Sequence, residues 1–205
     1  IRDYGNGTDF DGDGNVDDDL IARKEINGRD GNDVIFAYGG GSNITGGSGS
    51  DFIDGGADGD TGNSWDDEDR AVFSGKSSRY SLEGTTKLDP SLQSIAQALG
   101  VDLENYSDDQ EFTLVRDEAA ENGDVDVLVN VERIQFSDRD FSIKPIVRVE
   151  FDGDGNEVRR NVEGSIKSDV LLGGQFNDWI QGRQGDDMIF AGDGGDDINP
   201  GSGTD

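Results

Sequence analysis

Residues 164–205 read GSIKSDVLL GGQFNDWIQ GRQGDDMIF AGDGGDDIN PGSGTD, and they divide naturally into groups of nine. Every group has an aspartate at its sixth position, and the four complete groups have an aliphatic residue at the eighth position. The aspartates are Asp169, Asp178, Asp187, Asp196 and Asp205, and the aliphatic residues are Leu171, Ile180, Ile189 and Ile198. A fixed short period with glycine-rich turns predicts a solenoid in which each repeat stacks on its neighbours.

A second block with the same period occupies residues 28–63. Its clearest copy is Gly46–Asp54 (GGSGSDFID), with glycine at positions 1, 2 and 4, aspartate at position 6 and isoleucine at position 8. Ser42 takes the aspartate position of the preceding copy, and the copy that contains Asp60 has Gly62 in place of the aliphatic residue. We therefore expect a weak or empty metal site between Ser42 and Asp60, and a frayed end to this block.

The residue types of this pattern suit calcium. Calcium takes six to eight oxygen ligands from carboxylates and backbone carbonyls, and glycine tolerates the positive φ that a tight turn needs to aim its carbonyls inward. The residues after each aspartate alternate outward, inward and outward, as in a short strand, so the aliphatic residue enters the core. Two nonapeptides complete one coil, and an ion can lie between turns that are two repeats apart.

This rule predicts which aspartates share an ion. The pairs are Asp33–Asp51, Asp169–Asp187, Asp178–Asp196 and Asp187–Asp205. The predicted ligands of the two blocks are Asp33, Asp51, Asp60, Asp169, Asp178, Asp187, Asp196, Asp205, Gly28, Gly31, Gly47, Gly49, Gly174, Gly185 and Gly194. Sequences rich in glycine and aspartate are also typical of flexible acidic linkers, but a linker has no reason to keep an aliphatic residue at the eighth position.

Two further acidic loops are candidates for calcium. Residues 9–17 (DFDGDGNVD) match the first nine positions of an EF-hand-like loop, although the twelfth position is Leu20 instead of glutamate. The predicted ligands there are Asp9, Asp11, Asp13 and Asp17, and the alternative is an acidic turn. Residues 152–156 (DGDGN) lie between two strand-like runs, which favours a β-hairpin over a calcium site.

Residues 64–148 lose the nine-residue period. Runs such as Phe112–Arg116 and Val131–Phe136 alternate apolar and polar residues and predict antiparallel strands with one buried face. A helix is predicted with Asp89 as its N-cap, proline at its first position and Gly100 just past its end. This segment is therefore expected to be a small α+β insert with antiparallel strands and one helix.

The fold class expected is mainly β, with two parallel β-roll blocks that flank the insert. The predicted division of the chain is an acidic N-terminal segment at 1–27, a first roll at 28–63, the insert at 64–148, a hairpin or linker at 149–163, and a second roll at 164–205 that we expect to continue beyond this sequence.

The composition is strongly acidic. The chain has 205 residues, a formal charge of −29, no cysteine and no histidine, and only 31% of its residues are hydrophobic. Such a chain is expected to be disordered unless bound cations offset its repulsion. Its charge argues against a nucleic-acid partner, and it has no apolar stretch long enough for a membrane span. Without histidine it has no Ser-His-Asp triad or H-E-x-x-H motif, so we expect no enzymatic activity.

With these motifs, the chain resembles the repeats-in-toxin (RTX) family of secreted bacterial calcium-binding proteins. The insert is similar to a module often found beside such repeats, through Ala71–Gly75, Tyr80 and Asn130–Asp138 (NVERIQFSD). The resemblance implies a parallel β-roll, export by a type I secretion system of a Gram-negative bacterium, an extracellular or cell-surface location, and folding driven by external calcium. From the sites counted above we expect about four to seven calcium ions.

The leading interpretation is a calcium-binding structural module of a secreted or cell-surface RTX protein, of adhesin or surface-layer type, that folds on binding extracellular calcium. The alternative is a calcium-dependent accessory domain of a secreted enzyme (protease, lipase or epimerase) or of an RTX toxin. Neighbouring copies of the chain or cell-surface glycans are candidate partners besides calcium. Trp179 and Tyr38 are expected at outward-facing or turn positions that suit such contacts.

Overall fold

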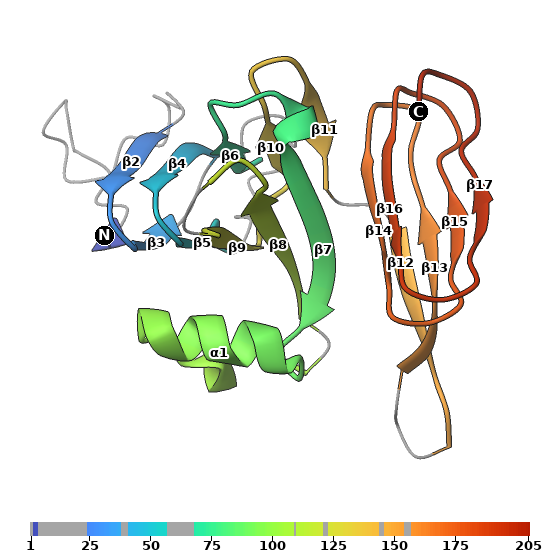
Figure 1. The fold of residues 1–205 in the computed structure, drawn as a ribbon, viewed down its shortest axis with the longest axis horizontal. Coiled ribbons are helices and arrows are strands. Elements are labelled where there is room, and N and C mark those ends of the chain that lie inside the picture. The colour runs from blue at the N-terminus through green and yellow to red at the C-terminus, as the bar shows by residue number, and fades with distance from the viewer. Residues whose placement is uncertain are drawn as a thin grey trace, which may run out of the picture.

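A computed structural model describes residues 2–3, 24–37, 41–56, 68–108, 110–120, 123–143, 146–153 and 157–205. This part of the chain is mainly β, with strands in four sheets and one α-helix (Figure 1). Several sequence predictions lie outside the described residues: the EF-hand-like loop with Asp9, Asp11, Asp13 and Asp17, and also Tyr38 and Asp60.

The first roll is a coil of short parallel strands. Its strands are β2 (Lys24–Asp30), β3 (Val34–Ala37), β4 (Ser42–Ser48) and β5 (Phe52–Asp54), and β1 (Arg2–Asp3) pairs with β3. β2 pairs with β4, which places Ile26 opposite Ile44, and β3 pairs with β5, which places Ile35 opposite Ile53. Alternate strands thus enter two sheets, and Ile35, Ile44 and Ile53 are buried between them. The eighth-position residues therefore form the core, as their spacing predicts.

The second roll repeats this arrangement. One of its sheets contains β13 (Glu157–Glu163), β15 (Trp179–Gln181) and β17 (Asp197–Asn199), and the other contains β14 (Val170–Gly174) and β16 (Met188–Gly192). Leu171 lies opposite Ile189, and Ile180 lies between Val162 and Ile198 in successive strands. Leu171 and Ile180 are buried, whereas Ile198 is 44% exposed because β17 is the edge strand of its sheet.

The insert continues the first roll. β6 (Arg70–Val72) stacks in parallel on β4, β10 (Arg133–Gln135) stacks in parallel on β6, and β9 (Val125–Val129) stacks in parallel on β5. Ala71, Ile134 and Leu128 take the core positions of these layers and are buried. The boundary expected near residue 63 therefore divides strands that belong to the same sheets. The expectation of antiparallel strands is wrong for β6, whose described pairings are parallel, whereas β9 and β10 each have one parallel and one antiparallel neighbour.

The rest of the insert matches the prediction more closely. β7 (Tyr80–Thr86), β8 (Glu111–Asp117) and β9 are antiparallel neighbours, and β11 (Asp140–Ser142) is antiparallel to β10. Two 3-10 turns, Ser77–Arg79 and Leu103–Asn105, join these elements. Helix α1 spans Pro90–Leu99 between the predicted caps: the Asp89 carboxylate accepts from the N–H of Ser91 at 2.6 Å, and Gly100 is left-handed.

The second roll begins from a hairpin and from the insert. β12 (Ile146–Phe151) and β13 form the predicted antiparallel hairpin, and β13 then stacks on β15. Ser142 of β11 forms a parallel bridge with Asp169. Strand β7 packs against β14, and Figure 1 shows β7 on the side of the insert that faces the second roll. One hydrophobic core consequently joins the first roll, the insert and Val170 of the second roll.

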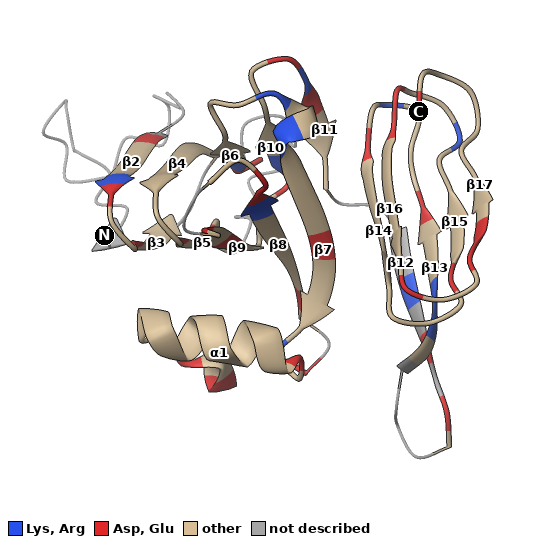
Figure 2. Cartoon of the chain, in the orientation of Figure 1, with Lys and Arg blue, Asp and Glu red and all other residues tan. Residues whose placement is uncertain are grey.

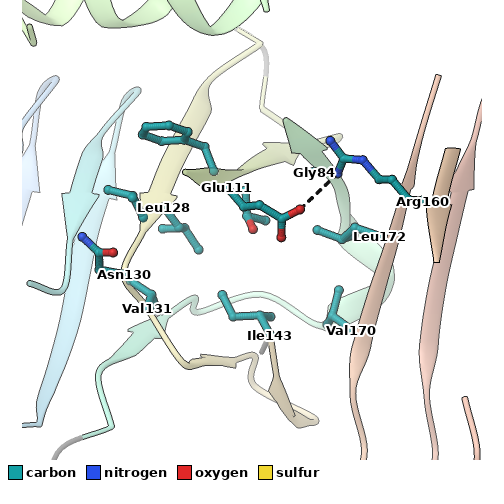
Figure 3. A pocket seen from close by; sticks show the side chains of 12 residues that line it. Gly84, Glu111, Leu128, Asn130, Val131, Ile143, Arg160, Val170 and Leu172 are labelled. Carbon is teal, nitrogen blue, oxygen red and sulfur yellow. Dashed lines mark ion pairs between the residues drawn. The ribbon is translucent and has the colours of Figure 1, made fainter. Parts of the chain in front are cut away.

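A small cavity remains at this junction. It has a volume of about 70 Å³, and Leu128, Val170 and Leu172 are among the residues that line it (Figure 3). Arg160 points into it from β13, and its guanidinium lies 3.7 Å from the carboxylate of Glu111. Drug-sized ligands occupy pockets of about 300–1,000 Å³, so this cavity is a packing defect that contains an ion pair. No described helix has the length and apolar character needed to cross a membrane.

Candidate metal centres

The sixth-position aspartates stack along each roll. In all four predicted pairs, the backbone N–H of the earlier aspartate donates to Oδ1 of the aspartate 18 residues later. The bonds run from Asp33 to Asp51 (2.8 Å), Asp169 to Asp187 (3.0 Å), Asp178 to Asp196 (2.9 Å) and Asp187 to Asp205 (3.0 Å). The structure therefore brings together each pair of aspartates that the spacing predicted.

Three of these carboxylates keep an oxygen that is buried and without a hydrogen-bond partner: Oδ2 of Asp33, Asp51 and Asp187. A buried, unsatisfied polar group costs about 1–3 kcal/mol, and a charged one costs more. A cation bound at these oxygens would remove that cost. The residues present therefore fit a hard divalent cation such as calcium.

A glycine keeps the space beside each of these oxygens open. A Cβ added to Gly28 would lie 2.7 Å from Oδ2 of Asp33 and would collide with the carbonyl oxygen of Gly46, in the next layer. The same two contacts, with a carboxylate and with a carbonyl 18 residues later, recur at Gly164, Gly173 and Gly182. Carboxylate and carbonyl oxygens that converge on one space are the ligand set that calcium takes in proteins.

The predicted turn glycines divide into two groups. Gly31, Gly47, Gly49, Gly185 and Gly194 have positive φ, and a side chain at Gly47 would collide with the backbone of Arg29. Gly28 and Gly174 lack positive φ: Gly28 leaves space, and the N–H of Gly174 donates to Oδ2 of Asp178 at 2.6 Å. Asp169 is similarly satisfied within its own turn by the N–H and hydroxyl of Ser165.

Ser42 has a partner from the insert. Its N–H donates to Oδ1 of Asp69 at 2.7 Å, and the N–H of Asp69 donates to Oε2 of Glu132 at 2.6 Å. Asp69 is followed two residues later by the buried Ala71, as the sixth-position aspartates are followed by the aliphatic residue of their repeat. The weak or empty site expected between Ser42 and Asp60 stays a prediction, because Asp60 lies outside the described residues.

Three acidic residues of the insert join these stacks and were missed by the sequence analysis: Asp69, Glu132 and Asp126. The N–H of Asp51 donates to Oδ1 of Asp126 at 2.9 Å, across 75 residues of sequence. Each of the three is followed two residues later by a buried apolar residue, in the triplets DRA, ERI and DVL. This acid-x-apolar triplet is the signal that could have found them.

Negative charge accumulates in these stacks. Burial, together with the charges of Asp33 and Asp124, raises the pKa of Asp51 to about 6. Burial likewise raises the pKa of Asp126 to about 8 and raises the pKa of Asp187. Figure 2 shows acidic residues on both rolls and on the insert. Within the described ranges no three acidic side chains converge on one point, so each centre has two carboxylates and would depend on backbone oxygens for the rest.

Comparison with known proteins identifies the two rolls. A family model described as the RTX calcium-binding nonapeptide repeat matches residues 27–62 and 163–205, in four copies. A search of the curated proteins found no match. The matched residues contain all four stacked aspartate pairs, and the insert lies outside them. The two rolls thus match RTX calcium-binding nonapeptide repeats, which typify secreted proteins.

Proposed function

We propose that this chain is a non-catalytic structural module of a secreted or cell-surface protein of adhesin or surface-layer type, and that extracellular calcium drives its folding. The observation that carries the proposal is the set of stacked carboxylates whose second oxygens are buried without a partner, on Asp33, Asp51 and Asp187. A fold with these features is stable only when something of opposite charge satisfies them.

The mechanism follows from the charge of the chain. At low calcium, stacked carboxylates repel one another, and a chain of formal charge −29 favours expanded states. Extracellular calcium sites have dissociation constants of about 10⁻⁴–10⁻³ M. An ion at ten times its dissociation constant stabilises the folded state by RT ln 11, about 1.4 kcal/mol. Four to six ions would contribute roughly 6–8 kcal/mol, which is comparable with the whole stability of a domain.

Composition supports the remaining parts of the proposal. The chain has no histidine and no cysteine, so metal ions take the stabilising role that disulfides have in many secreted proteins. The buried carboxylates are engaged in stacked pairs within the rolls, which supports a structural role for them. Export by a type I system from a Gram-negative bacterium is inferred from the RTX repeats.

Circular dichroism tests the proposal. The far-UV β signal and a cooperative thermal transition should be present at millimolar calcium, disappear on chelation and return when calcium is added back. Magnesium at equal concentration is the control for simple charge screening, because it demands a smaller octahedral site and should restore little of the signal. A chelated sample that keeps its full β signal and its thermal transition would overturn the proposal.

A further inference from the structure

We propose that the insert contributes a calcium site of its own, formed where Asp126 of β9 stacks on Asp51 of the first roll. Asp126 lies in no nonapeptide and outside the residues matched by the repeat family. The proposal rests on the proposed function only in taking calcium as the ion.

The stacking of β9 on β5 reproduces the stacking of β5 on β3. The N–H of Asp33 donates to Oδ1 of Asp51 at 2.8 Å, and the N–H of Asp51 donates to Oδ1 of Asp126 at 2.9 Å. The backbone bonds agree as well, because Phe52 N–H donates to the Asp33 carbonyl and Val127 N–H donates to the Asp51 carbonyl, both at 2.8 Å. Strand β9 therefore places a carboxylate where a further repeat would have placed one.

The second roll contains the matching triple built from repeats alone. Asp187 lies between Asp169 and Asp205 and is bonded to both in the same way that Asp51 is bonded to its neighbours. Both middle aspartates, Asp51 and Asp187, are at most 2% exposed, and both have a buried Oδ2 without a hydrogen-bond partner. The insert thus completes in the first roll the arrangement that three repeats make in the second.

Nothing described on the protein neutralises these groups. Within the described ranges, neither Asp51 nor Asp126 forms an ion pair with a lysine or arginine. Asp124 adds a further negative charge, which contributes to the raised pKa of both carboxyls. The hydroxyl of Ser50 accepts from the N–H of Val125 at 2.9 Å and ties the repeat turn to the start of β9. Two stacked carboxylates in a buried setting are the part of a site that attracts a divalent cation.

The decisive variant is Asp126→Asn in the full chain. The amide oxygen of asparagine can still accept from Asp51 N–H, so the layer is retained while its charge is removed. Ion counting by equilibrium dialysis at saturating free calcium should find one ion fewer than in the wild type. Glu104→Gln is the matched control, because it removes the same charge from an exposed position of the insert and should leave the count unchanged. An Asp126→Asn protein that binds as many ions as the wild type would overturn the proposal.

If the Asp126→Asn variant does not fold, the proposal can be tested on the wild-type protein. Anomalous scattering from calcium in crystals of the wild type should give a peak between Asp51 and Asp126 in addition to peaks at the repeat pairs. Peaks at the repeat pairs with none at Asp51 and Asp126 would refute the insert site and leave the proposed function standing. An absence of peaks at all the stacked pairs would refute both.

Discussion

At the scale of single residues, the first glycine of a repeat and the aspartate five positions later act as one unit. The glycine leaves open the volume that the carboxylate oxygen and the carbonyl of the next layer both border, as at Gly182 with Asp187 and Pro200. A methyl group in this volume would occupy the place of the ion. The sequence identified the aspartates because each is defined within nine residues, but of the first glycines it named only Gly28 as a ligand. The structure adds Gly46, Gly164, Gly173 and Gly182.

Gly182→Ala should therefore weaken calcium binding. Its Cβ would lie 2.5 Å from Oδ2 of Asp187 and would collide with the Pro200 carbonyl, so we expect the loss of one ion and of at least the roughly 1.4 kcal/mol that the ion provides. Gly195→Ala is the control, because its nearest neighbour would lie at an ordinary 3.5 Å and the change should stay within about 0.5 kcal/mol. Calcium titration and thermal unfolding measure both. Equal effects of the two substitutions would contradict this account of the glycine.

Substitution of Asp187 should remove more calcium ions than substitution of Asp205. Asp187 belongs to two stacked pairs, with Asp169 and with Asp205, whereas Asp205 belongs to one among the described residues. Asp187→Asn is therefore expected to remove or weaken two ions and Asp205→Asn one, as counted by isothermal titration calorimetry. Equal losses in the two variants would show that the pairs are not separate sites.

The raised pKa values of Asp51 and Asp126, about 6 and about 8, predict a pH dependence without calcium. Both folded-state values exceed the ordinary value of about 3.9, so the folded state binds protons more tightly than the unfolded state. The resulting stabilisation is complete below about pH 4 and is lost as the pH rises through 6 and 8. Chelated protein should accordingly show more β signal at pH 5 than at pH 8.

With calcium present, the pH dependence of stability should reverse. Protons and calcium compete for the same carboxylates, so calcium affinity should fall as the pH is lowered from 8 to 5. Asp126→Asn should reduce the dependence seen in chelator, because it removes the group with the higher pKa. A chelated protein whose β signal is the same at pH 5 and pH 8 would speak against the burial of these charges.

At the scale of elements, helix α1 and the repeat strands could be predicted from local sequence signals. Asp89 and Gly100 cap the helix where their residue types predict, and the aliphatic residues of the repeats mark the strands. The stacking of β6, β9 and β10 on the first roll was not predicted from the sequence. Their acids, Asp69, Asp126 and Glu132, bond to partners 27, 75 and 63 residues away. No period is visible across such unequal separations, and tertiary packing decides the pairing.

The cap of α1 offers a test that separates the helix from the metal. Asp89→Ala removes the acceptor for Ser91 N–H and should cost about 1 kcal/mol, measured by denaturant unfolding in saturating calcium. The number of bound ions should not change, because the helix belongs to a hydrophobic cluster with Phe112 and Leu114, and that cluster includes none of the stacked carboxylates. Ser94→Ala, on the exposed side of the helix, is the control and should have a much smaller effect.

At the scale of the whole molecule, the two rolls are linked through the insert. A single core contains Ile44 of the first roll, Phe136 and Phe141 of the insert and Val170 of the second roll. Because these side chains pack together, unfolding one roll exposes apolar surface of the other. The repeat pattern predicts each roll separately but does not predict that they share a core. The insert has no sequence period, so its contacts with a roll cannot be predicted from the spacing of residues.

One cooperative thermal transition is therefore expected in saturating calcium, with equal calorimetric and van't Hoff enthalpies. Asp33→Asn, which affects only the first roll, should lower the temperature of that single transition and should not split it. Two resolved transitions, of which Asp33→Asn moves one, would show that the rolls unfold independently.

The way in which the insert enters the first roll has a consequence for how such proteins diversify. Layers in this roll are joined by an acid, a spacer and a small or aliphatic residue, and Asp69–Ala71 and Asp126–Leu128 meet that requirement without a glycine-rich turn of the repeat type. Such triplets therefore allow a segment without the nine-residue period to continue the sheets of the roll, as this insert does. Recombination could graft new recognition domains into the solenoid without disturbing its register, and protein engineers could use the same joints.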